Sequence, residues 1–168
     1  MKTLLLVRHA KSSWDNFSVG DAERPLSERG KKNAPEMAKR LLKKKVAIDA
    51  FLSSPAKRAL TTAKLFAKEY SLPSGDIIVI PELYLADITA FQHAIAAAPP
   101  EAGSIAVFSH NSGITEFANS LTNVRIDNMP TCAVFGVTIA VNSWTEFAAA
   151  PKEFYLFDFP KSGENGEN

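Results

Sequence analysis

The 168-residue sequence has a single cysteine, almost no excess charge and only short apolar runs. Cys132 cannot close an intramolecular disulfide, and its apolar context, "CAVFGV", predicts a small buried side chain rather than a reactive thiol. The 19 Lys and Arg residues balance 18 Asp and Glu residues, so no global field points to nucleic acid or an anionic membrane as a partner. Any attraction for anions must therefore be local.

No segment approaches the roughly 18 apolar residues that a membrane-spanning helix needs. The start, "MKTLLLV", has a shorter apolar run than the about 7 to 15 residues of a signal peptide core, so it predicts a buried strand. We expect a cytoplasmic protein, in agreement with a lone thiol. The chain has the size of one domain, expected over residues 1–160, and the polar tail 161–168 is expected to be disordered.

Apolar periodicity predicts strands that alternate with helices. The expected strands are residues 3–7, 48–53, 76–80, 104–109, 132–141 and 153–159. A helix is expected between Ser27 and Lys45, in which Pro35 either causes a kink or lies in a first turn capped by Asn33. Further helices are expected after the caps Ser54 and Asp87 and after His110. This alternation predicts an α/β domain with a mostly parallel sheet and helices on both faces.

Cationic side chains follow three of the expected strands. Arg8 and His9 end the first strand, Arg58 lies in the opening turn of the helix after the second, and His110 follows the fourth. In open α/β sheets, ligands bind outside the carboxyl ends of the strands, where helix N-termini add unpaired N–H groups. Without an internal carboxylate, this positive cluster is expected to hold a dianion, most simply a phosphoryl group. The remaining histidine, His93, is predicted to be structural.

Four ordered segments, "LVRHAKSSW", "RPLSERG", "SSPAKRALTTA" and "VFSHNSGI", resemble the histidine phosphatase superfamily, also called phosphoglycerate-mutase-like. Within it, they are similar to the SixA-like phosphohistidine phosphatases. The resemblance implies a three-layer αβα sandwich and a metal-independent phosphatase without a cofactor. It also implies that His9 is the nucleophile and that Arg8, Arg58 and His110 complete the phosphate pocket. Ser12 and Asn111 are further candidates for phosphate contacts, and Ala10 stands where many members carry Gly.

The sequence differs from members of the family at the position of the proton donor. Members that act on phosphoesters carry a Glu shortly after the third strand, and the segment "PELYLAD" places Leu85 there. Glu82 and Asp87 lie nearby, but a solvated loop carboxylate and a helix cap are the simpler interpretations. A site without an acid suits P–N bonds, because a phosphorylated imidazole can be protonated on its distal nitrogen and leave as a neutral group.

The sequence therefore predicts a phosphohistidine phosphatase that acts on a phosphorylated protein. Arg8 and Arg58 are expected to keep His9 neutral through like-charge repulsion, and His110 is expected to act as a cation or as an N–H donor. The alternatives are a broad-specificity phosphomonoesterase for small phosphorylated substrates and a phosphate-dependent binding module without turnover. A metal-dependent hydrolase is disfavoured, because arginines beside both histidines would repel a cation.

Overall fold

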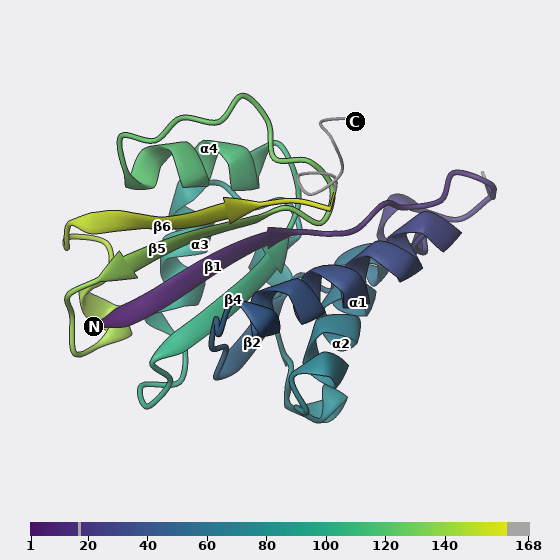
Figure 1. The fold of residues 1–168 in the computed structure, drawn as a ribbon. Coiled ribbons are helices and arrows are strands. Elements are labelled where there is room, and N and C mark those ends of the chain that lie inside the picture. The colour runs from purple at the N-terminus through teal and green to yellow at the C-terminus, as the bar shows by residue number, and fades with distance from the viewer. Residues whose placement is uncertain (17, 161–168) are drawn as a thin grey trace.

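The structure is a computed structural model that describes residues 1–16 and 18–160. The expectation of a disordered tail at 161–168 lies outside these residues. A six-stranded sheet has the order β3-β2-β4-β1-β5-β6 (Figure 1). The strands are β1 (Lys2–Arg8), β2 (Ala50–Ser53), β3 (Ile78–Val79), β4 (Ser104–Ser109), β5 (Val134–Ile139) and β6 (Lys152–Asp158). Strands β3, β2, β4 and β1 pair in parallel. Strand β5 pairs antiparallel with β1 on one side and with β6 on the other.

Two helices cover each face of the sheet. They are α1 (Glu28–Lys43) and α2 (Lys57–Glu69) on one face, and α3 (Ile88–Ala96) and α4 (Gly113–Leu121) on the other (Figure 1). The predicted α/β class, with a three-layer αβα sandwich around a mostly parallel sheet, is confirmed.

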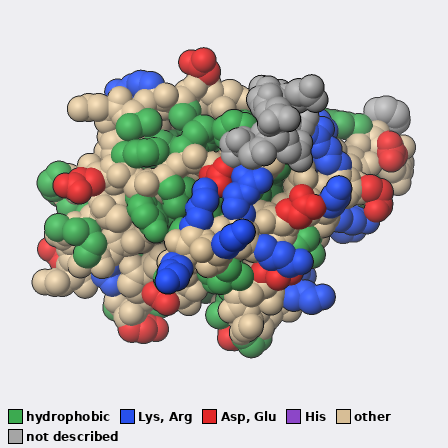
Figure 2. Space-filling view, viewed as in Figure 1, with side chains coloured by type: hydrophobic (Ala, Val, Ile, Leu, Met, Phe, Trp, Pro, Cys, Tyr) green, Lys and Arg blue, Asp and Glu red, His purple; other side chains and the backbone are tan. Residues whose placement is uncertain are grey.

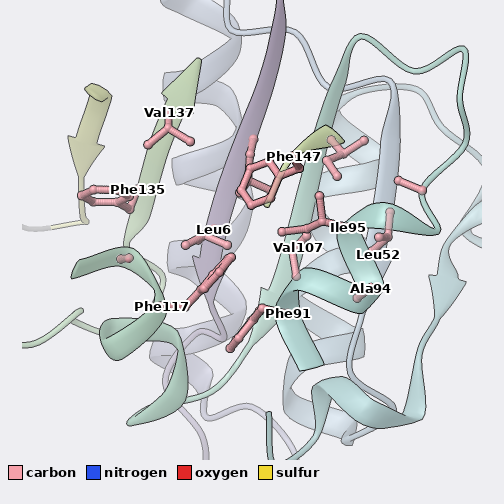
Figure 3. Close-up of a cluster of buried hydrophobic side chains, with 14 of the residues drawn as sticks. Leu6, Leu52, Phe91, Ala94, Ile95, Val107, Phe117, Phe135, Val137 and Phe147 are labelled. Atoms are coloured by element: carbon pink, nitrogen blue, oxygen red, sulfur yellow. The ribbon is translucent and has the colours of Figure 1, made fainter. Parts of the chain in front are cut away.

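Strand β1 is apolar throughout because both of its faces are covered. Leu5 and Val7 belong to the cluster under α1 and α2, and Leu4 and Leu6 belong to the cluster under α3 and α4. Figure 3 shows Leu6 beside Phe117 in the second cluster. Strand β1 thus runs through the middle of both cores, which fixes the position of the residues at its carboxyl end.

Three local predictions need correction. Helix α1 begins after Ser27, whose hydroxyl accepts from the Gly30 N–H, and continues through Pro35, so a first turn capped by Asn33 is wrong. Ser54 does not cap α2, which begins at Lys57, because its hydroxyl contacts His110 and the Ala56 N–H instead. The third strand is only two residues long, because a 3-10 turn over residues 74–76 takes up its expected start.

In Figure 2, Lys and Arg side chains gather over α1 on this face, with carboxylates between them. Arg40 of α1 and Lys44, the residue after this helix, bind Asp158 at the end of β6. Over residues 1–16 and 18–160, no helix is long and apolar enough to cross a membrane.

Candidate active site

The two predicted histidines follow neighbouring strands. Strands β1 and β4 pair in parallel with Arg8 opposite Ser109, and the His9 N–H donates to the Ser109 carbonyl at 3.1 Å. His9 and His110 are both buried, and their ring centroids lie 5.2 Å apart. The parallel register of the sheet therefore brings the two imidazoles together at its carboxyl edge.

Arg58 reaches this edge from the first turn of α2. The preceding loop is tied to β4, because the Ser54 N–H donates to the Phe108 carbonyl at 3.0 Å. Arg58 is only 6% exposed. Its Nη1 donates to the Asp21 carbonyl at 2.7 Å, and its Nη2 donates to the Asp21 carboxylate at 3.0 Å. Arg8 is anchored similarly, with Nη1 donating to the Met129 carbonyl at 2.8 Å.

Three buried side-chain nitrogens have no hydrogen-bond partner among the described residues. They are Arg8 Nε, Arg58 Nε and His110 Nδ1, so each belongs to a residue predicted to bind phosphate. Buried polar groups in proteins are nearly always paired, and each exception needs an explanation. These nitrogens belong to two arginines whose charges act on His9 and to a histidine whose ring centroid lies 5.2 Å from that of His9, so they indicate an anion site.

The tautomer of His9 follows from its hydrogen bond. Its Nδ1 lies 2.7 Å from the Ala10 carbonyl, which can only accept, so Nδ1 carries the proton and Nε2 keeps a lone pair. Burial lowers the pKa of His9 to about 4, opposed by the hydrogen bond to Ala10, and the charges of Arg58 and Arg8 lower it further. The expected neutral imidazole is present, although burial, rather than the arginines, is its main cause.

His110 is also held neutral. Burial lowers its pKa to about 3, with a smaller contribution from His9. A neutral His110 can act as the N–H donor, which is one of its two expected roles. The other ring nitrogen, Nε2, lies 2.7 Å from the Ser54 hydroxyl.

The expectation of a cluster without an internal carboxylate is wrong. Asp21, in the loop after β1, accepts from Arg58 and from the Tyr84 hydroxyl at 2.5 Å, and it lies 3.3 Å from Arg24 Nε. The Tyr84 hydrogen bond and the contact with Arg58 lower the pKa of Asp21 to about 2. Asp21 is therefore ionised at neutral pH and cannot donate a proton there.

The sequence interpretation missed Arg24 and Tyr84 as neighbours of the site. Arg24 donates to the Ser12 hydroxyl at 2.9 Å, and the Trp14 ring centroid lies 3.5 Å from its guanidinium carbon. Tyr84 packs edge-on against His110, with ring centroids 5.6 Å apart. The only available signals were the position of Arg24 in "RPLSERG" and of Tyr84 in "PELYLAD".

The other candidate residues have protein partners or lie exposed. Ser12 contacts Arg24, as above, and the Asn111 side chain binds Asn128 and accepts from Thr115 at 2.5 Å. Asp87 caps α3 by accepting from the Ala90 N–H at 2.8 Å, as its simpler interpretation predicts. Exposed residues are Glu82, Leu85 and His93. A cavity of about 270 Å³ next to His110 is lined by Tyr84, Leu85 and Asp87, among others.

No three His, Cys, Asp or Glu side chains lie together as a possible metal site in the described part of the chain. What the site does hold is a neutral imidazole with a free lone pair, two guanidinium groups and a second neutral imidazole. Such an arrangement combines a nucleophile with groups that bind an anion. These are the groups that phosphoryl transfer through a covalent intermediate requires.

Comparison with known proteins agrees with this chemistry. Residues 4–84 match the model of the histidine phosphatase superfamily (branch 1). An uncharacterized chloroplastic protein of Arabidopsis thaliana is 32% identical over 155 residues, 86% of this chain and 70% of that protein. Phosphoserine phosphatase 1 of Hydrogenobacter thermophilus is 40% identical over 74 residues, 43% of this chain and 34% of that protein.

Solved structures share the whole fold. A structure of the protein histidine phosphatase SixA complexed with tungstate is 25% identical, with a TM-score of 0.81 over 96% of this chain and 99% of that chain. A mycobacterial glucosyl-3-phosphoglycerate phosphatase, 13% identical, has a TM-score of 0.68 over 93% and 98% of the two chains. The chain therefore belongs to the histidine phosphatase superfamily, as a phosphatase whose fold is that of the SixA proteins.

Proposed function

We propose that this phosphatase hydrolyses phosphohistidine on a protein substrate, with His9 as the nucleophile. The observation that carries the proposal is the group of three unpaired buried nitrogens on Arg8, Arg58 and His110, the residues whose charges or rings lie near His9. A buried polar group without a partner costs about 1–3 kcal/mol. The oxygens of a phosphoryl group offer each of them a partner. The SixA structure with tungstate, also a tetrahedral oxyanion, supports this interpretation.

The first step is attack by His9 Nε2 on phosphorus. A P–N bond to His9 forms and the P–N bond to the substrate imidazole breaks. The leaving imidazole, protonated on its distal nitrogen by solvent water, departs as a neutral group. Arg8 and Arg58 stabilise the negative charge on the phosphoryl oxygens in the transition state. This electrostatic stabilisation is the main source of catalysis in phosphoryl transfer. Water then attacks the phosphorylated His9, releasing inorganic phosphate and the neutral imidazole.

The choice of phosphohistidine as substrate depends on which residues near the site could donate a proton to a leaving group. An alkoxide leaving group needs a proton donor. Asp21 is ionised and Asp87 caps α3. Glu82 and Glu116 are exposed, and Glu116 lines the cavity next to His110. A P–N substrate needs none of them. The similarity to a phosphoserine phosphatase favours a phosphomonoesterase as the second candidate.

The test is His9→Ala, with His93→Ala, which removes an exposed imidazole, as the matched control. His9→Ala should lower turnover of p-nitrophenyl phosphate and of a phosphohistidine peptide by about 10³-fold or more, as expected for loss of a nucleophile. Wild-type protein quenched during turnover should carry an acid-labile phosphoryl group on His9. Label on another residue, or full activity of His9→Ala, would contradict the assignment.

A substrate profile decides between the two candidates. Wild-type kcat/KM for phosphohistidine should exceed that for phosphoserine, and Asp87→Asn and Glu82→Gln should leave both values unchanged. If either substitution abolishes only ester hydrolysis, the protein is a phosphomonoesterase with that carboxyl as its acid.

A further inference from the structure

Ser54 is a fully buried hydroxyl next to the site that the mechanism above does not use. It follows β2, and its Oγ accepts from the Ala56 N–H at 3.1 Å. The same Oγ lies 2.7 Å from His110 Nε2. The serine hydroxyl is therefore the contact that fixes one side of the His110 ring, and the direction of this hydrogen bond determines what the other side can do.

Counting protons sets that direction. Ser54 has one hydroxyl proton, and among the described residues His110 Nε2 is the only acceptor in contact with it. If His110 Nε2 were the donor instead, the Ser54 proton would be buried without an acceptor, which is costly. In that case, His110 Nδ1 would also present a lone pair to the bound anion. Both penalties disappear when Ser54 donates.

We propose that Ser54 donates to His110 Nε2 and thereby holds His110 as its Nδ1–H tautomer, so that the buried, unpaired Nδ1 is a hydrogen-bond donor to the phosphoryl oxygens. Ser54 is then a positioning residue that acts through His110. This inference builds on the proposed function, because it assigns the donor that the phosphoryl group meets there. His9 and His110 thus both carry their proton on Nδ1, but for opposite purposes. His9 frees Nε2 to attack, and His110 has Nε2 occupied so that Nδ1 can donate.

The direct test is the tautomer of His110 in the intact wild-type protein. Imidazole ¹⁵N shifts and long-range ¹H–¹⁵N correlations, recorded at pH 7 in phosphate-free buffer and assigned with His110→Asn, should show Nδ1–H for His110. An Nε2–H tautomer would overturn the inference. This measurement does not depend on turnover, so it separates the inference from the proposed function, which fails instead if His9→Ala stays active.

The kinetic test is Ser54→Ala, with Ser53→Ala as the matched control. Ser53 is equally buried, but its hydroxyl donates to the Ser54 carbonyl and makes no contact with His110. Ser54→Ala should lower kcat/KM about 10- to 100-fold, by analogy with the partners that orient metal-binding histidines, and should shift the His110 signals toward Nε2–H. Ser54→Thr, which keeps the hydroxyl, should restore the tautomer. Unchanged tautomer and rate in a folded Ser54→Ala would overturn the inference.

Discussion

Asp21 is a negative charge in direct contact with Arg58, one of the two arginines proposed to bind the anion. It bridges Arg58, Arg24 and Tyr84, and half of its side chain is exposed at the rim of the site. A carboxylate in this position orients Arg58, but it also repels an incoming dianion.

Asp21→Asn should therefore strengthen the binding of tungstate or inorganic phosphate, because it removes one negative charge and keeps a side chain that can still hydrogen-bond. The inhibition constant should fall roughly threefold to tenfold at low salt, as expected for one solvent-screened charge, and the gain should shrink at high salt. Asp76→Asn, an exposed carboxylate on the 3-10 turn 74–76, controls for net charge. Weaker anion binding by Asp21→Asn would mean that orienting Arg58 outweighs the repulsion.

The sequence predicted the cations of the site but not the carboxylate that faces them. Arg8, His9 and His110 follow strands, and strands have a periodic apolar signal that gives their ends a defined place in the sheet. Asp21 begins a short 3-10 turn in the connection after β1, where no period predicts which side chain it meets. Ser54 illustrates a different failure of sequence prediction. Its position before a helix predicts a helix cap, but in the structure its hydroxyl contacts His110 instead.

At the level of secondary-structure elements, a buried hydroxyl of α2 holds the first residues after β1 in place, in addition to the Arg58 contacts with Asp21 further along the loop. The Thr62 hydroxyl donates to the Arg58 carbonyl at 2.7 Å and accepts from the Ala10 N–H at 3.0 Å. Ala10 is the residue whose carbonyl orients His9, and it is not among the residues with positive φ. One hydroxyl thus connects the helix that carries Arg58 to the loop that orients the proposed nucleophile.

Thr62→Val, which keeps the shape of the side chain but removes its hydroxyl, should leave the Ala10 N–H buried without an acceptor. The free energy of unfolding in urea should fall by about 1–3 kcal/mol, and kcat should fall because the Ala10 carbonyl is no longer fixed. Thr61→Val is the matched control on the same helix, at a less buried position. Thr62→Ser should recover most of both losses, and a Thr62→Val protein with wild-type stability and kcat would contradict this account.

The accuracy of the element predictions follows the strength of the apolar pattern. Strand β4 spans residues 104–109 as predicted, because it is buried on both faces and its whole sequence is apolar or small. Strand β3 is at the edge of the sheet, with Ile78 and Val79 both exposed, so an apolar sequence alone overestimated its length. Helix α1 continues through Pro35 because its Ser27 cap and its buried face, from Ala34 to Leu41, outweigh one lost hydrogen bond.

For the molecule as a whole, the site is a source of instability at low pH. His9 and His110 are neutral in the folded state, with pKa values of about 4 and about 3, whereas a free histidine has a pKa of about 6.5. As the pH falls below about 6.5, the unfolded chain binds these protons before the folded chain does. Stability is therefore full above this pH and decreases toward the folded-state pKa values.

In phosphate-free buffer, the free energy of unfolding measured with urea should decrease between pH 6.5 and pH 4 by roughly 2 to 3 kcal/mol for each of the two histidines. The double variant His9→Asn with His110→Asn should lose much less stability over this interval, because neither side chain titrates. The matched control, His93→Asn, keeps both site histidines and should retain the steep loss. Asp21 contributes little over this interval, because its stabilisation is lost mainly between the pKa of an unfolded aspartate, about 3.9, and its folded-state pKa of about 2. Equal slopes for the wild type and the double variant would show that the buried imidazoles do not control acid stability.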